Sequence, residues 1–388
     1  MASSSRARIR AALAWASVGA WAWAVLVALD DRRHRRSLDS VDGASEGTCV
    51  SVVVPARNEA GRMDQALTSL EAQTGVTLDV LVVDDESVDD TYAEASLHAS
   101  ARIRVLRGAP LPPGWVGKSW ANHQGARQAT GKWLLFTDAD VVHAPDAIGR
   151  AVALAESCGV SGLTVLPRLE SSSWAEHVVQ PAAAVLIRSF VAPGPLVRSP
   201  HVPISIAAGG FILVRRVVYD EVGGHEGIRN RLVDDKALAE RLKRHGHPLT
   251  LADGTTHVRV RMYRGPRELW RGWRKNTSVG LAEGSPALAV AAATAGALVA
   301  IAPYVALARG PRRLGALAVG LQLAVRQDVE HAAPTPLPYR LTLPLGCCFL
   351  SLTSVVSSVD RLRGRVVWRG RSYATDGERS LRRVPPGD

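Results

Sequence analysis

Three long stretches without a charged residue limit what this chain can fold into. They cover residues 11–29, 286–308 and 341–359. A helix rises 1.5 Å per residue, so the first stretch would reach about 28 Å, close to the ~30 Å hydrocarbon thickness of a bilayer. We therefore expect a transmembrane anchor at residues 11–29 and a C-terminal membrane region of two or three helices at residues 286–359. The number stays open because the apolar run between the two C-terminal stretches is too short for a clear span.

Charge gives the expected orientation. The chain has 47 Lys and Arg against 36 Asp and Glu, a net charge of +11, and its arginines cluster beside the apolar stretches. That placement favours a membrane surface over nucleic acid as the partner. Arginines after the first stretch favour a multi-pass protein of the cell membrane whose central domain faces the cytoplasm. A cleaved signal peptide is the alternative, because residues 14–16 resemble a cleavage site, but the apolar run continues past them.

The region between the membrane segments alternates between strand-like and helix-like runs, which indicates an α/β sheet. The apolar runs are nearly continuous, so we expect strands that are covered on both faces and largely parallel. Ligands of such sheets bind beyond the carboxyl ends of the strands. The expected strands are 49–54, 79–83, 102–106 and 132–136, and the expected helices are 59–72, 91–99 and 119–129. The expected organisation is a basic N-terminus (1–10), the anchor (11–29), a linker (30–47), one central domain (48–285), the membrane region (286–359) and a basic tail (360–388).

Polar residues follow the first two expected strands. Pro55 to Glu59 stand where a dinucleotide-binding fold would place glycines, so a GxGxxG dehydrogenase is disfavoured. Asp84 and Asp85 follow the second strand and can accept hydrogen bonds from ribose hydroxyls or a base edge. A turn that caps the next helix is the alternative. A Walker A loop is also disfavoured, because Pro112 stands where that loop requires its first glycine.

The fourth expected strand ends in Asp138-Ala139-Asp140. Two carboxylates spaced by one residue at a strand end can hold a divalent cation whose open positions accept phosphate oxygens. Further along, Asp234 and Asp235 precede an amphipathic helix. Alone they would be an ordinary helix start, since acids there complement the helix dipole. Together with the upstream motifs they are candidates for a catalytic base.

In this order the motifs resemble a family 2 glycosyltransferase with the GT-A fold. The matching segments are residues 52–59, 82–87, 117–121, 137–140, 209–211 and 233–242. Within the family, the chain is most similar to membrane glycosyltransferases of hopanoid biosynthesis and carotenoid glycosylation. The signs are residues 114–121, 261–264 and 272–276 and a late segment, Trp368 to Tyr373.

The resemblance implies roles for single residues. Lys118 would lie near the base or diphosphate, and Asp138 and Asp140 would hold Mg²⁺ or Mn²⁺ against the diphosphate of a UDP- or GDP-linked sugar. Asp235 or Asp234 would be the base of an inverting transfer, and Gly209 and Gly210 would lie on the acceptor side. The nucleotide pocket would be lined by Pro55, Arg57, Asn58, Glu59, Asp84, Asp85, Lys118 and Asp138.

The acceptor is the most open part of the prediction. Aromatic and basic residues at 261–276, among them Trp270 and Trp273, suggest an interfacial helix that lets an apolar acceptor reach the site. A plain membrane anchor is the alternative. We expect a lipid acceptor of the isoprenoid, hopanoid or carotenoid kind, with a polysaccharide or a polyprenyl phosphate as alternatives. An inactive membrane scaffold of the same fold is the non-enzymatic alternative. Residues 174–190 are expected to be core, with an oligomer contact or acceptor groove as alternatives.

Overall fold

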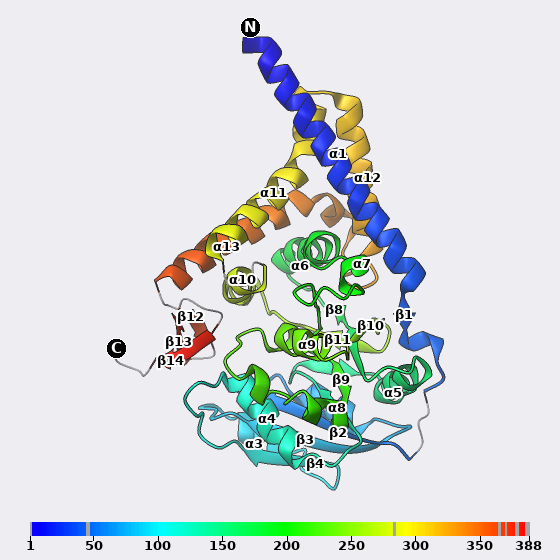
Figure 1. Ribbon diagram of the computed structural model, residues 1–388, viewed down its shortest axis with the longest axis vertical. Coiled ribbons are helices and arrows are strands. Elements are labelled where there is room, and N and C mark those ends of the chain that lie inside the picture. Colours follow the sequence, from blue (N-terminus) through cyan, green and yellow to red (C-terminus); the bar gives the residue numbers. More distant parts are fainter. Residues whose placement is uncertain are drawn as a thin grey trace. The chain divides into compact units, whose positions relative to one another are not determined.

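The computed structural model describes residues 2–43, 47–281, 285–363, 366–368, 371–376 and 380–384 (Figure 1). Its contacts divide the chain into two compact units. The helical unit consists of Met1–His34, Leu169–Ser199 and Tyr263–Arg363, and the sheet unit consists of Arg35–Arg168, Pro200–Met262 and Gly364–Asp388. This division differs from the expected boundaries in two ways. Residues 169–199 and the segment that begins at residue 263 belong to the helical unit rather than to the central domain, and residues 364–388 of the expected tail belong to the sheet unit.

An eight-stranded sheet forms the centre of the sheet unit, and only β9 runs antiparallel to its neighbours. The mixed, mainly parallel α/β sheet expected from the sequence is therefore confirmed. In sheet order the strands are β1 (Arg36–Ser37), β10 (Thr250–Asp253), β7 (Gly162–Leu166), β9 (Ile212–Arg215), β5 (Trp133–Phe136), β2 (Cys49–Ala56), β3 (Thr77–Asp84) and β4 (Ile103–Arg107).

The register of the central strands brings their ends together. β2 pairs in parallel with β3, so that Ala56 lies opposite Asp84, and with β5, so that Val53 lies opposite Phe136. The valines of β2 are almost fully buried, as expected for a strand that is covered on both faces. The polar segments after β2, β3 and β5 consequently share one edge of the sheet.

Helices complete the sheet unit. The hydrophobic core of this unit includes residues of the central strands, α4, α8 and α9. The helix α4 begins at the motif Gly117-Lys118, and α9 begins at the acidic pair Asp234-Asp235. The helical segments are η1 (Leu38–Ser40), α2 (Asp64–Glu71), α3 (Thr91–Ser96), α4 (Gly117–Gln128), α5 (Ala147–Ser157), α8 (Arg216–Glu221), η3 (Glu226–Ile228) and α9 (Asp234–Arg244).

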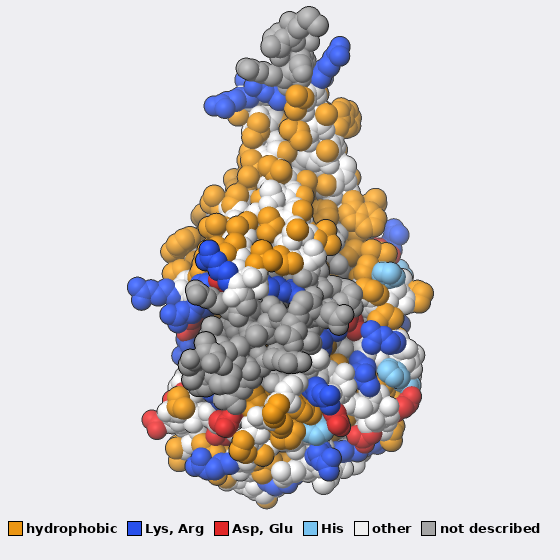
Figure 2. Space-filling view, turned by 60° about the vertical axis from the view of Figure 1, so that its left-hand side comes forward, with side chains coloured by type: hydrophobic (Ala, Val, Ile, Leu, Met, Phe, Trp, Pro, Cys, Tyr) orange, Lys and Arg blue, Asp and Glu red, His pale blue; other side chains and the backbone are white. Residues whose placement is uncertain are grey.

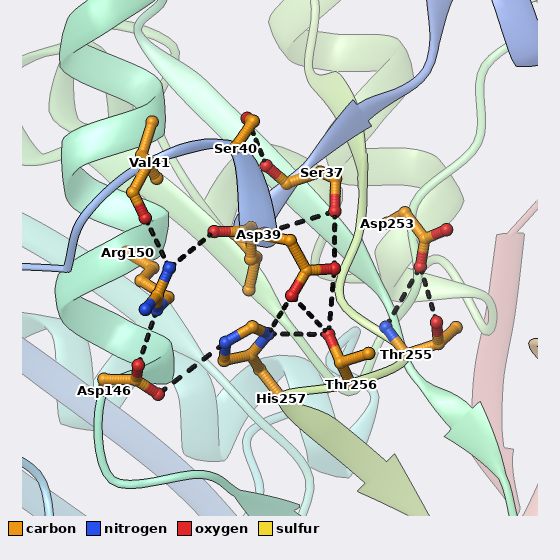
Figure 3. Close-up of polar contacts among 11 residues, drawn as sticks. Ser37, Asp39, Ser40, Val41, Asp146, Arg150, Asp253, Thr255, Thr256 and His257 are labelled. Carbon is orange, nitrogen blue, oxygen red and sulfur yellow. Dashed lines mark hydrogen bonds and ion pairs between the residues drawn. The ribbon is translucent and has the colours of Figure 1, made fainter.

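Polar contacts fix the segment before β2 to the sheet unit (Figure 3). Arg150 on α5 donates to the backbone carbonyls of Leu38 and Val41 and is paired with Asp146 at 2.5 Å. Thr256 donates to Asp39 at 2.9 Å from the other side. Residues 38–41 of the expected linker are therefore docked in this unit, whereas residues 30–34 end α1 in the helical unit.

Two smaller sheets belong largely to the sheet unit. β6 (Val141–His143) pairs antiparallel with β11 (Val258–Val260), and the same small sheet includes β8 (Arg168–Leu169). The third sheet lies in the expected basic tail, where β13 (Arg371–Asp376) pairs antiparallel with both β12 (Val366–Trp368) and β14 (Ser380–Val384). These last strands lie outside the elements predicted from the sequence.

Among the residues that the structure describes, three helices of the helical unit are long and apolar enough to cross a membrane: Arg8–His34, Pro286–Arg309 and Leu343–Leu362. Each overlaps an uncharged stretch identified in the sequence. Figure 2 shows hydrophobic side chains gathered over this unit. Its helical segments are α1 (Ala2–His34), α6 (Trp174–Leu186), η2 (Ile187–Val191), α7 (Gly194–Val197), α10 (Pro266–Leu281), α11 (Pro286–Arg309), α12 (Arg312–Asp328), η4 (Leu337–Leu341) and α13 (Leu343–Leu362).

These helices share a core of their own. Trp21 on α1 and Leu269 on α10 are fully buried in it, together with the apolar face of α6. The expectation that residues 174–190 form core is thus confirmed for α6. On α10, the ring of Trp270 makes an edge contact with Phe349, and Trp273 packs against the same core.

Candidate active site

The loops that follow β2 and β3 are bonded to each other. Arg57 donates to the backbone carbonyls of Asp85 and Glu86, and the amide of Asn58 donates to the Ser87 hydroxyl at 3.1 Å. Asn58 and Glu86 both have positive φ angles, 53° and 55°, which non-glycine residues seldom adopt. Such conformations persist where the surroundings enforce them, often at ligand sites.

Two acidic side chains at the end of β3 are buried. Asp84 is 4% exposed, and its Oδ1 atom has no hydrogen-bond partner within the described part of the chain. A buried carboxylate oxygen without a partner is costly unless a ligand supplies a donor. Asp85 is 3% exposed, and burial raises the pKa of its carboxyl group although Arg371 pairs with it.

Lys118 is held in place by the surroundings of α4. The amide of Val116, just before the helix, donates to the carbonyl of Arg229 at 2.7 Å. One turn further, Asn122 lies 3.3 Å from the ring nitrogen of His225, which also contacts Tyr219 at 2.9 Å. Burial lowers the pKa of His225 to about 3, with a smaller contribution from Lys118, so this histidine is neutral at physiological pH.

The ammonium group of Lys118 joins acids that are far apart in the sequence. Its Nζ lies 2.7 Å from Asp138 Oδ1 and 3.7 Å from Asp234 Oδ2. Burial would lower the pKa of Lys118, but the surrounding carboxylates outweigh this effect and raise it, so the side chain stays charged. The aspartate after β5 and the acidic pair of α9 therefore lie around one cation.

A turn before β9 completes this cluster. β9 lies antiparallel beside β5, and the Thr137 hydroxyl donates to the carbonyl of Gly210 at 2.7 Å. A Cβ atom at Gly209 would lie 2.9 Å from Asp235 Oδ2 and 3.5 Å from Lys118 Nζ. The absence of a side chain at Gly209 leaves space directly beside the carboxylate of Asp235.

Asp235 has the properties of a general base. Its Oδ1 accepts a hydrogen bond from the amide of Lys236 at 2.6 Å, while Oδ2 faces Gly209. Burial and the charge of Asp234 raise the pKa of Asp235 to about 6. A carboxylate with a pKa nearer to neutrality is better matched to removing a proton from a hydroxyl group.

The donor set at the end of β5 is suited to a hard divalent cation that is shared with a ligand. Within the described residues, no group of three or more His, Cys, Asp or Glu could hold a metal ion. Mg²⁺ is commonly bound through one or two carboxylates while substrate phosphates and water supply the other oxygens. The half-buried carboxylates of Asp138 and Asp140 fit that arrangement. The carboxylate of Asp138 already pairs with a cation, the ammonium group of Lys118.

The structure thus gathers most of the predicted site residues in the sheet unit. Asp138 and Asp234 contact Lys118, and Gly209 lies beside Lys118 and Asp235, while the loops from Pro55 to Glu59 and after Asp84 are bonded to each other at the strand ends. Trp270 and Trp273 instead belong to the helical unit, where they pack against its core. Arg371 was not predicted as a site residue, although its segment Trp368 to Tyr373 was noticed as a motif.

Filling the space at Gly209 is a direct test of the site. We expect Gly209→Val to lower kcat/KM about 10²-fold, because displacement of Asp235 or Lys118 by about 1 Å disturbs the reacting geometry. The thermal unfolding midpoint should change little, since the side chain enters a half-open turn. Gly320→Val is the matched control, because no atom lies within 4 Å of a Cβ atom there. An active Gly209→Val enzyme would remove this turn from the site.

Part of the chain is similar in sequence to known glycosyltransferases. Residues 51–223 match the family described as Glycosyl transferase family 2. The chain is 28% identical over 261 residues to a 4,4'-diaponeurosporenoate glycosyltransferase of Staphylococcus haemolyticus, covering 65% of this chain and 68% of the relative. A protein of the same name from Staphylococcus aureus is 26% identical over 269 residues, covering 67% of this chain and 68% of the relative.

A solved structure shares the fold. A mannosyltransferase from Pyrobaculum calidifontis, determined in complex with GDP-Man and Mn²⁺, matches with a TM-score of 0.57 at 21% identity. The match covers 92% of this chain and 98% of that protein. The predicted GT-A fold is confirmed.

Proposed function

We propose that this glycosyltransferase, whose residues 51–223 match glycosyl transferase family 2, transfers a sugar from a nucleotide sugar to a lipid acceptor at a membrane. The reaction would be a single displacement with inversion at the anomeric carbon. The acceptor oxygen forms a bond to that carbon, the bond to the diphosphate breaks, and a nucleoside diphosphate leaves.

The observation that carries this proposal is the cluster around Lys118. Asp138 follows β5 and Asp234 begins α9, yet both carboxylates lie within 4 Å of the same ammonium group. An acid for the donor side and the acidic pair that begins α9 thus lie around one ammonium group, and Asp235 of that pair lies beside Gly209. This arrangement supports transfer between two bound substrates.

The donor would lie along the strand ends. The unpartnered Oδ1 of Asp84 supports recognition of a donor N–H or O–H group, such as those of a nucleobase or ribose. Lys118 would bind the negative diphosphate through its ammonium group. The Pyrobaculum mannosyltransferase binds GDP-Man, and we propose a UDP- or GDP-linked sugar for this chain.

Asp138 and Asp140 would hold a divalent cation, Mg²⁺ or Mn²⁺. When bound, such an ion neutralises the charge that develops on a departing diphosphate. The Mn²⁺ in the Pyrobaculum structure supports this assignment.

Asp235 would remove the proton of the acceptor. A hydroxyl is a poor nucleophile near neutral pH, so a carboxylate within hydrogen-bond reach takes its proton during attack. Oδ2 is the atom available for this step, because Oδ1 accepts the Lys236 amide. The open space at Gly209 would admit the acceptor oxygen.

The helical unit supports a lipid acceptor. In the described part of the chain, three of its helices are long and apolar enough to cross a membrane, and the staphylococcal relatives are named for 4,4'-diaponeurosporenoate. We propose an isoprenoid, hopanoid or carotenoid-like acceptor, a location in the cell membrane, and a sheet unit that faces the cytoplasm. The arginines that follow the first span support this orientation.

The raised pKa of Asp235 predicts the pH dependence of the reaction. The base acts only when ionised, so kcat/KM should fall about tenfold per pH unit below about pH 6, well above the usual aspartate range near 3.9. Asp234→Asn removes a charge that raises this pKa, and we expect its acidic limb to move to lower pH. Nucleoside diphosphate release from about pH 5 to 8 measures both profiles. An acidic limb at the same pH in the variant would contradict the assignment.

The proposed function is tested by following the sugar. Membranes that contain the full chain are incubated with radiolabelled UDP- and GDP-sugars and Mn²⁺, and the products are extracted with organic solvent. We expect one donor to release nucleoside diphosphate and to transfer label to the organic phase. Label that enters an aqueous polymer would favour a polysaccharide acceptor, and label on an acid-labile lipid phosphate would favour a polyprenyl phosphate. Absence of release from every donor would favour the inactive scaffold.

A further inference from the structure

Arg371 brings the end of the chain to the candidate nucleotide pocket. It is the first residue of β13, and its side chain is only 3% exposed. Its Nη1 lies 2.5 Å from Asp85 Oδ2, and its Nη2 lies 3.1 Å from Asp85 Oδ1 and 2.5 Å from Glu86 Oε2. One guanidinium group therefore binds both oxygens of Asp85 and a second carboxylate.

The start of α4 is shaped around this pair. A Cβ atom at Gly117 would lie 2.2 Å from Arg371 Nη1 and 2.5 Å from Asp85 Oδ2. Such separations are far below contact distance, so a side chain at this position would push the arginine and the aspartate apart. Because Lys118 is the next residue, the contact lies directly beside the residue proposed to bind the donor diphosphate.

The second arginine in the neighbourhood has a different function. Arg57 donates to the backbone carbonyls of Asp85 and Glu86 and thereby fixes the loop. Arg371 is bonded to the Asp85 carboxylate and opposes the effect of burial on that acid, although the pKa of Asp85 stays raised. A bidentate arginine fixes the orientation of a carboxylate and leaves further lone pairs on its oxygens for other donors.

A buried ion pair is weak evidence for stability, because two apolar residues of similar size often stabilise a protein as well. Here the pair lies at a strand end where ligands of α/β sheets bind, next to the unpartnered oxygen of Asp84. The geometry favours a role in ligand recognition over simple attachment of the tail.

We propose that Arg371 is a positioning residue of the donor site, which holds the Asp85 carboxylate in the orientation that recognises the nucleotide; this rests on the proposed glycosyltransferase function. The donor site is then built from two distant parts of the chain, the region that matches the family and the sheet formed by β12, β13 and β14. Arg371 acts through Asp85 and has no part in the proton transfer at Asp235.

The test compares Arg371→Gln, Arg371→Lys and a matched control in the full-length protein in detergent. Arg104→Gln is the control, because Arg104 also pairs with an aspartate of β3, Asp79, at 2.8 Å. We measure donor KM, kcat, and the Kd of UDP and of GDP with Mn²⁺ by calorimetry. Arg371→Gln should raise KM and Kd at least about tenfold with kcat within about threefold, because the partner of a buried charge is lost. Arg371→Lys should recover part of the affinity, and Arg104→Gln should resemble the wild type.

Asp85 provides a second comparison. If Arg371 acts through Asp85, the double variant Asp85→Asn/Arg371→Gln should bind UDP or GDP no more weakly than Asp85→Asn alone. Additive losses, an unchanged KM in Arg371→Gln, or tighter binding in that variant would each overturn the proposal. Tighter binding would instead indicate that the pair blocks the pocket. If Arg371→Gln fails to fold, Arg371→Lys keeps the charge and decides the question by the same measurements.

Failure of the two proposals can be told apart. A wild-type protein that releases no nucleoside diphosphate from any sugar donor contradicts the proposed function, whereas UDP and GDP binding still tests Arg371. If the wild-type protein is active and Arg371→Gln has an unchanged donor KM, only the proposed role of Arg371 is contradicted.

Discussion

Asp235→Asn is expected to lower kcat about 10³-fold with little change in donor KM. General-base catalysis typically contributes 10²- to 10⁴-fold, and an amide cannot take the proton of the acceptor. The substitution keeps the size of the side chain, and the Oδ1 atom can still accept the Lys236 amide, so the start of α9 should remain intact. Nucleoside diphosphate release and label transfer to the lipid extract measure the loss.

The control for this variant is Asp220→Asn on α8. Its side chain is 60% exposed, and its carboxylate pairs with Arg216 at 4.0 Å. It should retain wild-type activity, as most surface substitutions do. If Asp234→Asn loses activity while Asp235→Asn keeps it, the base is Asp234. This outcome would contradict the assignment of Asp235 as the base, which is argued from its position beside Gly209.

The sheet could be predicted from the sequence because its strands are buried on both faces. Continuous apolar runs predicted the bounds of β2, β3, β4 and β5 to within a few residues. The helix expected at 59–72 was less accurate, since α2 covers only Asp64–Glu71. The amide of Glu59 donates to the hydroxyl of Thr91, the first residue of α3, at 2.7 Å. Such a tertiary contact holds the chain out of a helix but leaves no signal in local periodicity.

The site was predicted as separate motifs rather than as a geometry. Chain order places Asp138 and Asp235 at strand and helix ends, but the antiparallel pairing of β9 with β5 is needed to bring Gly209 beside Asp235 and Lys118. Lys118 was expected near the base or diphosphate, and its contacts with two acids require the tertiary fold. Arg371 had no local signal for a site, because an arginine in a basic tail is equally consistent with a membrane surface.

The helical unit shows a different limit of sequence reasoning. Hydropathy located the apolar helices, but it could not assign α6 to the same core. An amphipathic helix of apolar and small residues can pack on a sheet or on other helices equally well. Whether Trp270 and Trp273 contact an acceptor stays a prediction, and in the structure their rings pack within the helical unit.

Removal of the divalent cation should have an effect as large as loss of the base. We expect EDTA to abolish label transfer and Mn²⁺ or Mg²⁺ to restore it, because neutralising a departing diphosphate is worth several kcal/mol. Asp138→Ala should lose about 10³-fold in kcat and should not be rescued by excess metal. Asp146→Ala is the matched control, since its side chain is 36% exposed like that of Asp138 and is likewise paired with a cation, here Arg150.

The structure also predicts which binding properties Asp138→Ala keeps and which it loses. Lys118 loses its nearest carboxylate but keeps Asp234, so the fold around α4 should survive and UDP or GDP should still bind in the absence of metal. Mn²⁺ should no longer strengthen nucleotide binding, because Asp140 supplies only one of the two carboxylates that are proposed to hold the ion. Calorimetry with and without Mn²⁺ separates these effects. An Asp138→Ala protein whose nucleotide affinity still rises with Mn²⁺ would place the metal elsewhere.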